Sequence, residues 1–388
     1  NVAIGFEAGK SVTTGIENTI VGGLAGDALT TGTYNVAIGT YALSTEDTGG
    51  RSTAIGYGAL TNQNYDGSAY NTAIGYNAGN DITSGVQNTI MGGLAGDALT
   101  TGQYNTAIGY LALSTEDTGD QNVAIGRAAL MTLNYDGDGN NVAVGNNAGA
   151  SATTAIQSTF IGAFSGDAVT TGLANTAIGY NALSGEDEHG YNTAVGHGAL
   201  KVQNAGADAY NVAVGASAGL SVSTGIHNTL IGGLAGDAIT SGNTNVAVGY
   251  QALTSETQGD RSVALGVSAL EAQNNTSDAD IYNVAVGYHA GKSVTTGKEN
   301  VFIGGNTADS ITTGIRNVAI GHGALQTEDE HGYNVAIGNR ALQTQNAGAD
   351  AYNLAVGSNA GQSITTATRN TLIGGLSGDA ITTGSDNV

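Results

Sequence analysis

Residues 1–5 read Asn-Val-Ala-Ile-Gly, and variants of this five-residue phrase return along the entire chain. Successive copies start 17, 17, 17 and 19 residues apart, and this set of four recurs about every 70 residues, from starts at 1, 71, 141, 211, 283 and 353. A unit this short cannot bury an apolar face alone, so it must stack on its neighbours. We therefore expect one continuous repeat domain over 1–388. Because the chain opens on one phrase and breaks off within another, we expect it to be a segment of a longer fibre.

Each phrase has the composition of a short β-strand. Its second residue is Val, Thr or Leu, its fourth is aliphatic or Met, and Gly ends all 22 complete copies. A run rich in β-branched residues and bounded by Asn and Gly predicts a strand of four or five residues. Stacked copies predict an all-β parallel solenoid of about 22 rungs. We expect a second short strand where the first two repeats of a set close, at 11–15 and 28–32.

Two columns of the aligned repeats are nearly invariant. Unvarying Gly indicates a backbone conformation closed to other residues, or an approach too close for a Cβ. Asn opens all but three of the 23 copies, with Ser in its place at 52, 158 and 262. Its side chain is predicted to bond to backbone and to stack rung upon rung. The predicted structural ladder includes Asn1, Asn18, Asn35, Asn71, Gly5, Gly22, Gly39 and Gly75.

The predicted strand is apolar on both faces. Val2 and Ile4 point one way and Ala3 the other, since side chains alternate along a strand. A strand with two apolar faces is usually buried on both, so the chain is predicted to associate with copies of itself. In the second repeat the middle residue of the phrase is the large Ile20, and the residue directly after the phrase is the small Gly23. In the fourth repeat the middle residue is the small Ala54, and the residue after the phrase is the large Tyr57. This exchange of bulk indicates close packing that limits volume.

Charge and composition exclude several classes of partner. The formal net charge is −22, which would repel nucleic acid and anionic membrane surfaces. No apolar run of 18 residues exists, so we expect no membrane insertion in this segment. Cys is absent, which excludes disulfides and thiolate metal sites. The acidic residues gather in the turns, where we expect them to be solvated.

The sequence predicts no enzyme and no cofactor. The stretch 22–27 resembles a calcium-binding nonapeptide, but it occurs once per 70 residues rather than in tandem, so a structural turn is the better interpretation. Any Ca²⁺ would bind at the acidic column Asp27, Asp97, Asp167, Asp237, Asp309 and Asp379. Two histidines lie in equivalent acidic loops, 186–191 and 328–333, and three such loops around an axis would supply ligands for a cation.

Tyrosines form the predicted contact surface. Six of the 17 directly precede a repeat, namely Tyr34, Tyr70, Tyr104, Tyr210, Tyr282 and Tyr352. Tyr buries a large area at low entropic cost, so these residues are candidates for contact with a receptor. The alternative interpretation is that they seal seams between protomers.

The phrase, followed by a small residue and a Gly-containing turn, resembles the head repeats of YadA-like trimeric autotransporter adhesins, and related repeats occur in some bacteriophage tail fibres. The resemblance covers essentially all of the chain. It implies a left-handed parallel β-roll, a homotrimeric rod and exposure outside the cell, on a bacterial surface or a virion. Two departures are the longer repeats and the lack of coiled-coil heptads.

The expected function is that of a surface-exposed adhesin or fibre. It would project from its carrier and attach, through many weak sites, to an unknown cell-surface, matrix or glycan receptor. One alternative is a tail-fibre shaft or a structural spacer without binding activity. The Thr-Thr-Gly turns suggest an ice-binding solenoid as a further alternative, but the Thr pairs are interrupted in third and fourth repeats.

Overall fold

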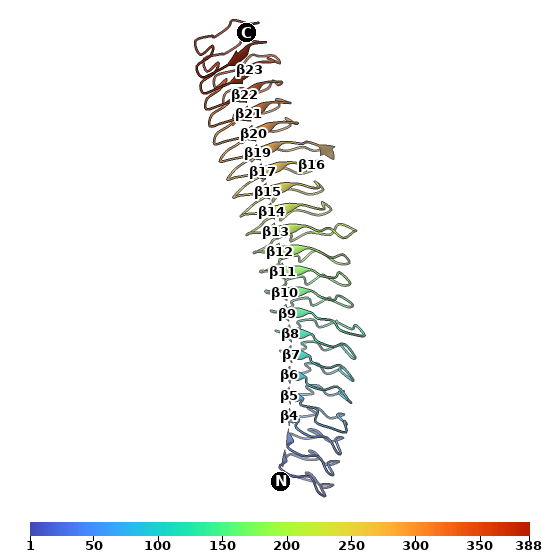
Figure 1. Ribbon diagram of the computed structural model, residues 1–388. Helices are drawn as coiled ribbons and strands as arrows, with labels where there is room; N and C mark the ends of the chain where they lie inside the picture. The colour runs from blue at the N-terminus through green and yellow to red at the C-terminus, as the bar shows by residue number, and fades with distance from the viewer. The chain divides into compact units, whose positions relative to one another are not determined.

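The computed structural model describes all residues from 1 to 388, which divide into two compact units, Asn1–Asn192 and Thr193–Val388. The chain forms β-strands and no helix. In each unit successive phrases supply successive parallel strands, one above the next (Figure 1). The prediction of an all-β parallel solenoid of about 22 turns is confirmed.

The first unit contains one strand in each of its turns. These strands are β1 (Val2–Ile4), β2 (Thr19–Val21), β3 (Val36–Ile38), β4 (Thr53–Ile55), β5 (Thr72–Ile74), β6 (Thr89–Met91), β7 (Thr106–Ile108), β8 (Val123–Ile125), β9 (Val142–Val144), β10 (Thr159–Ile161) and β11 (Thr176–Ile178).

The second unit repeats this arrangement and adds a small separate pair, β16 (Gly259–Asp260) with β18 (Ala279–Asp280). Its main strands are β12 (Thr193–Val195), β13 (Val212–Val214), β14 (Thr229–Ile231), β15 (Val246–Val248), β17 (Val263–Leu265), β19 (Val284–Val286), β20 (Val301–Ile303), β21 (Val318–Ile320), β22 (Val335–Ile337), β23 (Leu354–Val356) and β24 (Thr371–Ile373).

Each main strand has three residues, so the prediction of four or five was too long. Equivalent phrase positions pair in register, with Val2 opposite Thr19 and Ala3 opposite Ile20. The ladder continues past the strand, since the Gly22 N–H donates to the Ile4 carbonyl at 2.8 Å. Gly22 itself has φ +139°, which lies outside the β region and ends the strand at Val21.

The core is built from the middle residue of each strand. Ala37, Ala54, Ile20 and Phe160 are all fully buried. The residue after the phrase Gly lies outside instead, with half of Tyr57 exposed. The predicted exchange of side-chain volume between the middle of the phrase and the residue after it is therefore wrong, because the second of these positions lies outside the core. Inside the core, the large side chain of Ile20 lies against Gly9 and Gly26. The third and fourth turns have Leu43 and Leu60 at the position that these glycines occupy.

The second short strand predicted at 11–15 and 28–32 is absent, and both segments are turns and bends. The N–H groups of Thr13 and Gly15 both donate to the Thr30 carbonyl, at 2.9 and 3.2 Å. Two donors that converge on one acceptor curve the backbone, whereas a strand offers one donor to each carbonyl in succession. The segment still stacks on its neighbour but forms no regular strand.

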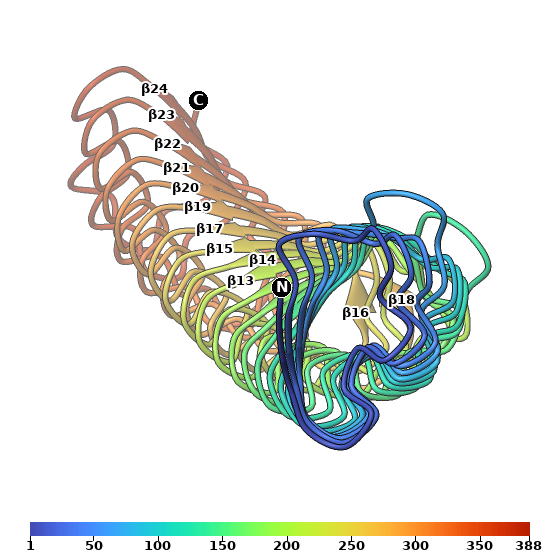
Figure 2. The same ribbon diagram turned by 90° about the horizontal axis from the view of Figure 1, so that it is seen from below.

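The longer fourth turns carry exposed loop residues, as at Asn64 and Tyr65. In the view along the stack, one blue and one green loop extend beyond the outline of the neighbouring turns (Figure 2). The packed column is therefore unaffected by variation in these loops.

Candidate functional site

An asparagine–glycine ladder ties successive turns together. The Asn18 side chain donates to the Gly32 carbonyl at 2.8 Å, and its own N–H donates to Asn1 Oδ1 at 2.9 Å. The Asn35 N–H donates in turn to Asn18 Oδ1 at 2.9 Å. The same side-chain bond joins Asn71 to the Gly85 carbonyl at 2.7 Å. Each of these Asn residues thus closes its own turn and holds the backbone of a neighbouring one, whereas the side chains of Asn122, Asn192 and Asn334 donate to the carbonyl two residues earlier.

The glycines of this ladder approach backbone too closely for a side chain. Gly5 has φ +137°, and a Cβ there would lie 2.5 Å from the Gly22 carbonyl oxygen. Gly22 meets Gly39 in the same way, Gly39 meets the next phrase Gly, and Gly75 meets Gly92. These positions have a structural role that the chain's own packing explains.

The outer side of the strands is an apolar surface that the chain leaves uncovered. On this side, Ile38 and Ile55 are only half-buried. Ala37 and Ala54, the middle residues of the same strands, are fully buried. Several outer residues are more than a third exposed, namely Met91, Ile161, Val214, Ile231 and Ile303. The outer aliphatic face is the third residue of each main strand, which is Ile, Val, Leu or Met, together with the first, which is Val, Leu or Thr; it runs along every turn of each unit without a partner.

The predicted tyrosine column lies exposed at the edge of the turns. Tyr34, Tyr70, Tyr104, Tyr210, Tyr282 and Tyr352 are each about half exposed and have positive φ between 50° and 62°. Arg51 lies over the rings of Tyr34 and Tyr70, at 5.4 and 5.5 Å from their centroids. Such stacking fixes the rings in place. Contact with a receptor or a second copy stays a prediction.

The aspartate column does not assemble into a site. Its members lie in second turns of successive sets, with three other turns between them. Lys10 Nζ lies 3.8 Å from Asp27, and burial raises the pKa of the Asp97, Asp167 and Asp309 carboxyls. No cluster of three metal-ligating side chains includes a member of this column.

The loops that close third turns contain a buried glutamate, which overturns the expectation that all turn acids are solvated. Glu46, Glu116, Glu186, Glu256 and Glu328 are fully buried. Each caps its loop, as where Glu46 Oε1 accepts the Gly49 N–H at 2.7 Å. The signal was present in the sequence, because Glu occupies the same position in all five complete sets.

Two of these loops, 186–191 and 328–333, also hold an aspartate and a histidine, and we call them the acidic–histidine loops. The ligand atoms of Glu328, Asp329 and His331 all lie within 4.8 Å of one another. Glu328 Oε1 accepts the N–H groups of Asp329 and His331 at 3.2 and 3.3 Å, and His331 Nδ1 lies 3.6 Å from it. Burial raises the pKa of the Glu328 carboxyl, and the hydrogen bond from His331 acts against that rise.

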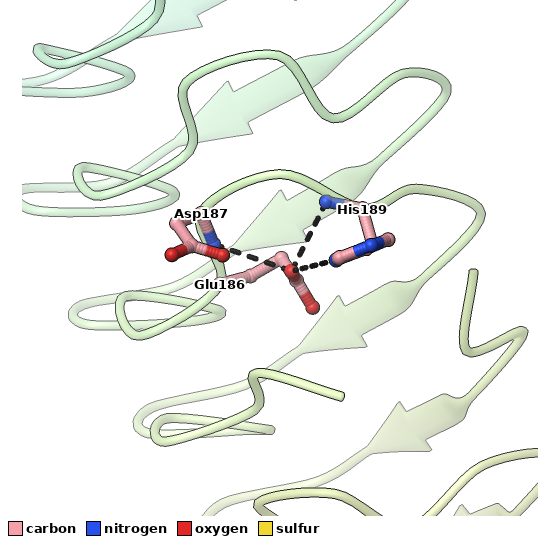
Figure 3. Close-up of side chains that lie close together, drawn as sticks. All are labelled: Glu186, Asp187 and His189. Carbon is pink, nitrogen blue, oxygen red and sulfur yellow. Dashed lines mark hydrogen bonds and ion pairs between the residues drawn. The ribbon is translucent and has the colours of Figure 1, made fainter. Parts of the chain in front are cut away.

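The first unit repeats this geometry. One oxygen of Glu186 lies between the Asp187 N–H, the His189 N–H and the His189 ring (Figure 3). His189 Nδ1 is 3.7 Å from Glu186 Oε1. The two histidines and their acidic neighbours were noted from the sequence, but the burial of the Glu was not.

The chain matches no protein-family model and no curated protein. No helix in the structure has the length and apolar character needed to cross a membrane. Neither unit contains a pocket, so the candidate features lie in the loops and on the surface.

Proposed function

We propose that this chain is the shaft of a surface-exposed fibre or adhesin in which three copies associate through their outer aliphatic faces. The proposal includes a left-handed β-roll with turns of 17, 17, 17 and 19 residues. It also places the fibre outside the cell, on a bacterial surface or a virion. The observation that carries it is the outer aliphatic face, which recurs at every turn of each unit and stays partly exposed.

Further copies of the same chain are the occupants that this face fits. A partner must match an apolar row that repeats at the spacing of the turns, and another copy presents that row with the same spacing. Stable interfaces bury about 800 Å² per partner. The outer aliphatic face runs along eleven turns in each unit, so it offers an extended surface for such an interface. The trimer, rather than a dimer, is supported by the resemblance to trimeric adhesin heads.

Light scattering on the purified chain, coupled to size exclusion, tests the assembly. We expect a mass of three chains, since the exposed aliphatic rows favour burial against each other. Chemical cross-linking should then trap a three-chain species. A soluble monomer that persists at micromolar concentration would contradict the proposed assembly.

Attachment through the shaft is the second part of the proposal, and it rests on multivalency. Many weak identical sites on one fibre raise avidity without a deep pocket. The loops 61–69 and 202–209 are the candidates for these sites, because they project from fourth turns and are largely exposed.

Shortening these two loops separates an adhesive shaft from a spacer. We expect the shortened chain to lose binding to cells or to a glycan array while its far-ultraviolet circular dichroism and mass stay unchanged. Equal binding by both chains would favour the alternative, a fibre shaft or spacer whose receptor-binding part lies elsewhere.

A further inference from the structure

The five buried glutamates differ in whether their second carboxylate oxygen has a partner. Glu46 Oε2 accepts Gln63 Nε2 at 3.0 Å and the Tyr65 N–H at 3.2 Å. Glu256 Oε2 accepts Gln273 Nε2 at 2.8 Å and Asn275 Nδ2 at 2.9 Å. The equivalent oxygen of Glu116 accepts the Tyr135 N–H at 3.2 Å. In these three loops the buried carboxylate is satisfied through both oxygens.

The acidic–histidine loops lack this second set of bonds. Glu328 is fully buried, yet its Oε2 has no hydrogen-bond partner, and Gln345 Nε2 in the next turn has none either. The carboxylate–amide bond that the loops of Glu46 and Glu256 make is therefore broken here. An unpaired buried carboxylate oxygen carries a desolvation cost, so its environment is incomplete without a further partner.

A histidine nitrogen is unpaired in the same place. His331 Nδ1 is buried, has no hydrogen-bond partner and lies 3.6 Å from Glu328 Oε1. That distance is too long for a hydrogen bond. It is close to the separation of about 3.4 Å between two ligands of one tetrahedral zinc with bonds of about 2.1 Å. Histidine replaces the Gly of the other three loops only where the Glu oxygen is unpaired.

We propose that each acidic–histidine loop binds one divalent transition-metal ion of the zinc class. In the second unit the ligands are the carboxylates of Glu328 and Asp329 and the Nδ1 atom of His331. In the first unit they are the corresponding atoms of Glu186, Asp187 and His189. The positions of these ligands follow from a single loop, so the site does not depend on how copies of the chain associate.

The ligand set indicates which metal the loop selects. An imidazole nitrogen with two carboxylates suits Zn²⁺ and its neighbours, whereas Ca²⁺ takes six to eight oxygen ligands. The N–H groups of Asp329 and His331 hold Glu328 Oε1 in place, as supporting hydrogen bonds do around metal ligands. About a quarter of the His331 side chain is exposed, which leaves a remaining coordination position open to water.

Zinc titration of the full chain tests the proposal by stoichiometry. Isothermal calorimetry and equilibrium dialysis with metal analysis should find two Zn²⁺ per chain. His331→Gly should leave one, and His189→Gly with His331→Gly should leave none. Gly is the chain's own residue at this position, at 49, 119 and 259, so these variants preserve the loop. His189→Gln with His331→Gln provides a second pair that keeps side-chain bulk.

His322→Tyr is the matched control, because equivalent third turns carry Tyr110, Tyr180 and Tyr250, and it should still bind two Zn²⁺. Co²⁺ in place of Zn²⁺ should give visible absorption bands that disappear in the double Gly and double Gln variants. The proposal is overturned if the unsubstituted chain binds no zinc. It is equally overturned if either double variant retains two Zn²⁺ ions.

Discussion

At the scale of single residues, the phrase glycine is required for two reasons that act together. Gly215 has φ +142°, and a Cβ there would lie 2.5 Å from the Gly232 carbonyl oxygen. The first property strains any other residue, and the second places its side chain inside a neighbouring backbone. The last phrase glycine, Gly374, keeps a positive φ of +123° but has no atom within 4 Å of an added Cβ.

Substitutions at these two glycines distinguish the cost of backbone strain from the cost of placing a side chain against the neighbouring backbone. We expect Gly215→Val to lower the free energy of unfolding by about 1–3 kcal/mol per site, through strain and overpacking, and by three times as much in a trimer. Gly374→Val should cost less, because only the strain remains. Thermal denaturation of both variants measures the difference. Unchanged melting of Gly215→Val would remove the case for an obligate glycine.

The turn residue Asp97 should make the stability of the folded chain depend on pH. Burial raises the pKa of Asp97, and nearby Asp81 raises it further, so the ionised form is the less stable one in the folded chain. The stabilising contribution of the protonated form is complete below the ordinary value of 3.8 and is lost as pH rises through the higher folded pKa.

Asp97→Asn should therefore stabilise the chain at pH 7, by less than about 1 kcal/mol because the carboxylate is partly solvated. The gain should vanish near pH 3, where the parent residue is protonated. Denaturation midpoints at both pH values test this, and Asp66→Asn, at an exposed loop position, serves as the control. A gain that is the same at both pH values would contradict the electrostatic explanation.

At the scale of one turn, the core alternates two ways of filling the same space. In β6 the middle residue Ile90 is large, and Gly96 follows in the turn with φ +48°. In β7 the middle residue is Ala107, and Leu113 occupies the equivalent turn position with φ +53°. A Cβ on Gly96 would lie 3.0 Å from Leu99 Cδ1 and 3.2 Å from Ile90 Cδ1, so a large side chain at position 96 competes with Ile90 for the same space.

This exclusion predicts a compensating pair of substitutions. Ile90→Ala should cost about 2–5 kcal/mol through the cavity that it leaves. Gly96→Leu alone should destabilise by overpacking, at about 1–3 kcal/mol. The double variant should recover part of both losses, since it moves the bulk from the strand to the turn as in β7, while Leu99 remains where the β7 turn has Glu116. A double-mutant cycle by chemical denaturation measures the coupling, and strictly additive costs would show that the two positions do not share space.

The phrase predicted where strands lie, but not how each turn closes. Val2 to Ile4 could be assigned because β-branched residues and a bounding Gly favour a short strand. The second strand at 11–15 could not be excluded, because the sequence does not show that Thr13 and Gly15 share one acceptor. Left-handed backbone at Tyr34 and Leu43 was also hidden, since this conformation is normally a property of Gly and Asn.

The candidate metal site was only partly predictable for a related reason. His331 and its acidic neighbours could be found in the sequence, but acidic turn residues are usually solvated. The burial of Glu328 depends on loop N–H groups that turn inward. Its Oε2 is unpaired because the Gln345 side chain in the following turn makes no hydrogen bond to it. Neither the burial nor the missing bond follows from residue types alone.

At the scale of the whole molecule, two forces act on association in opposite directions. The outer aliphatic face favours contact between copies, and a formal net charge of −22 per chain opposes it. Charge repulsion is long-ranged and screened by salt, whereas apolar burial acts only at contact. We therefore expect the assembled fraction to rise when ionic strength is raised from low values, which analytical ultracentrifugation measures.

A charge placed on the outer aliphatic face should reverse the balance. Ile161 in β10 and Ile231 in β14 are more than a third exposed, so glutamate at these positions can be solvated within a single chain. In the assembly the same carboxylates would be buried without a partner, which costs several kcal/mol at each interface. Ile161→Glu with Ile231→Glu should therefore give a folded monomer in light scattering. Val202→Glu, in an exposed loop, should assemble like the parent chain. If the double variant keeps the parent mass, copies associate through a different surface, and the outer face needs another explanation.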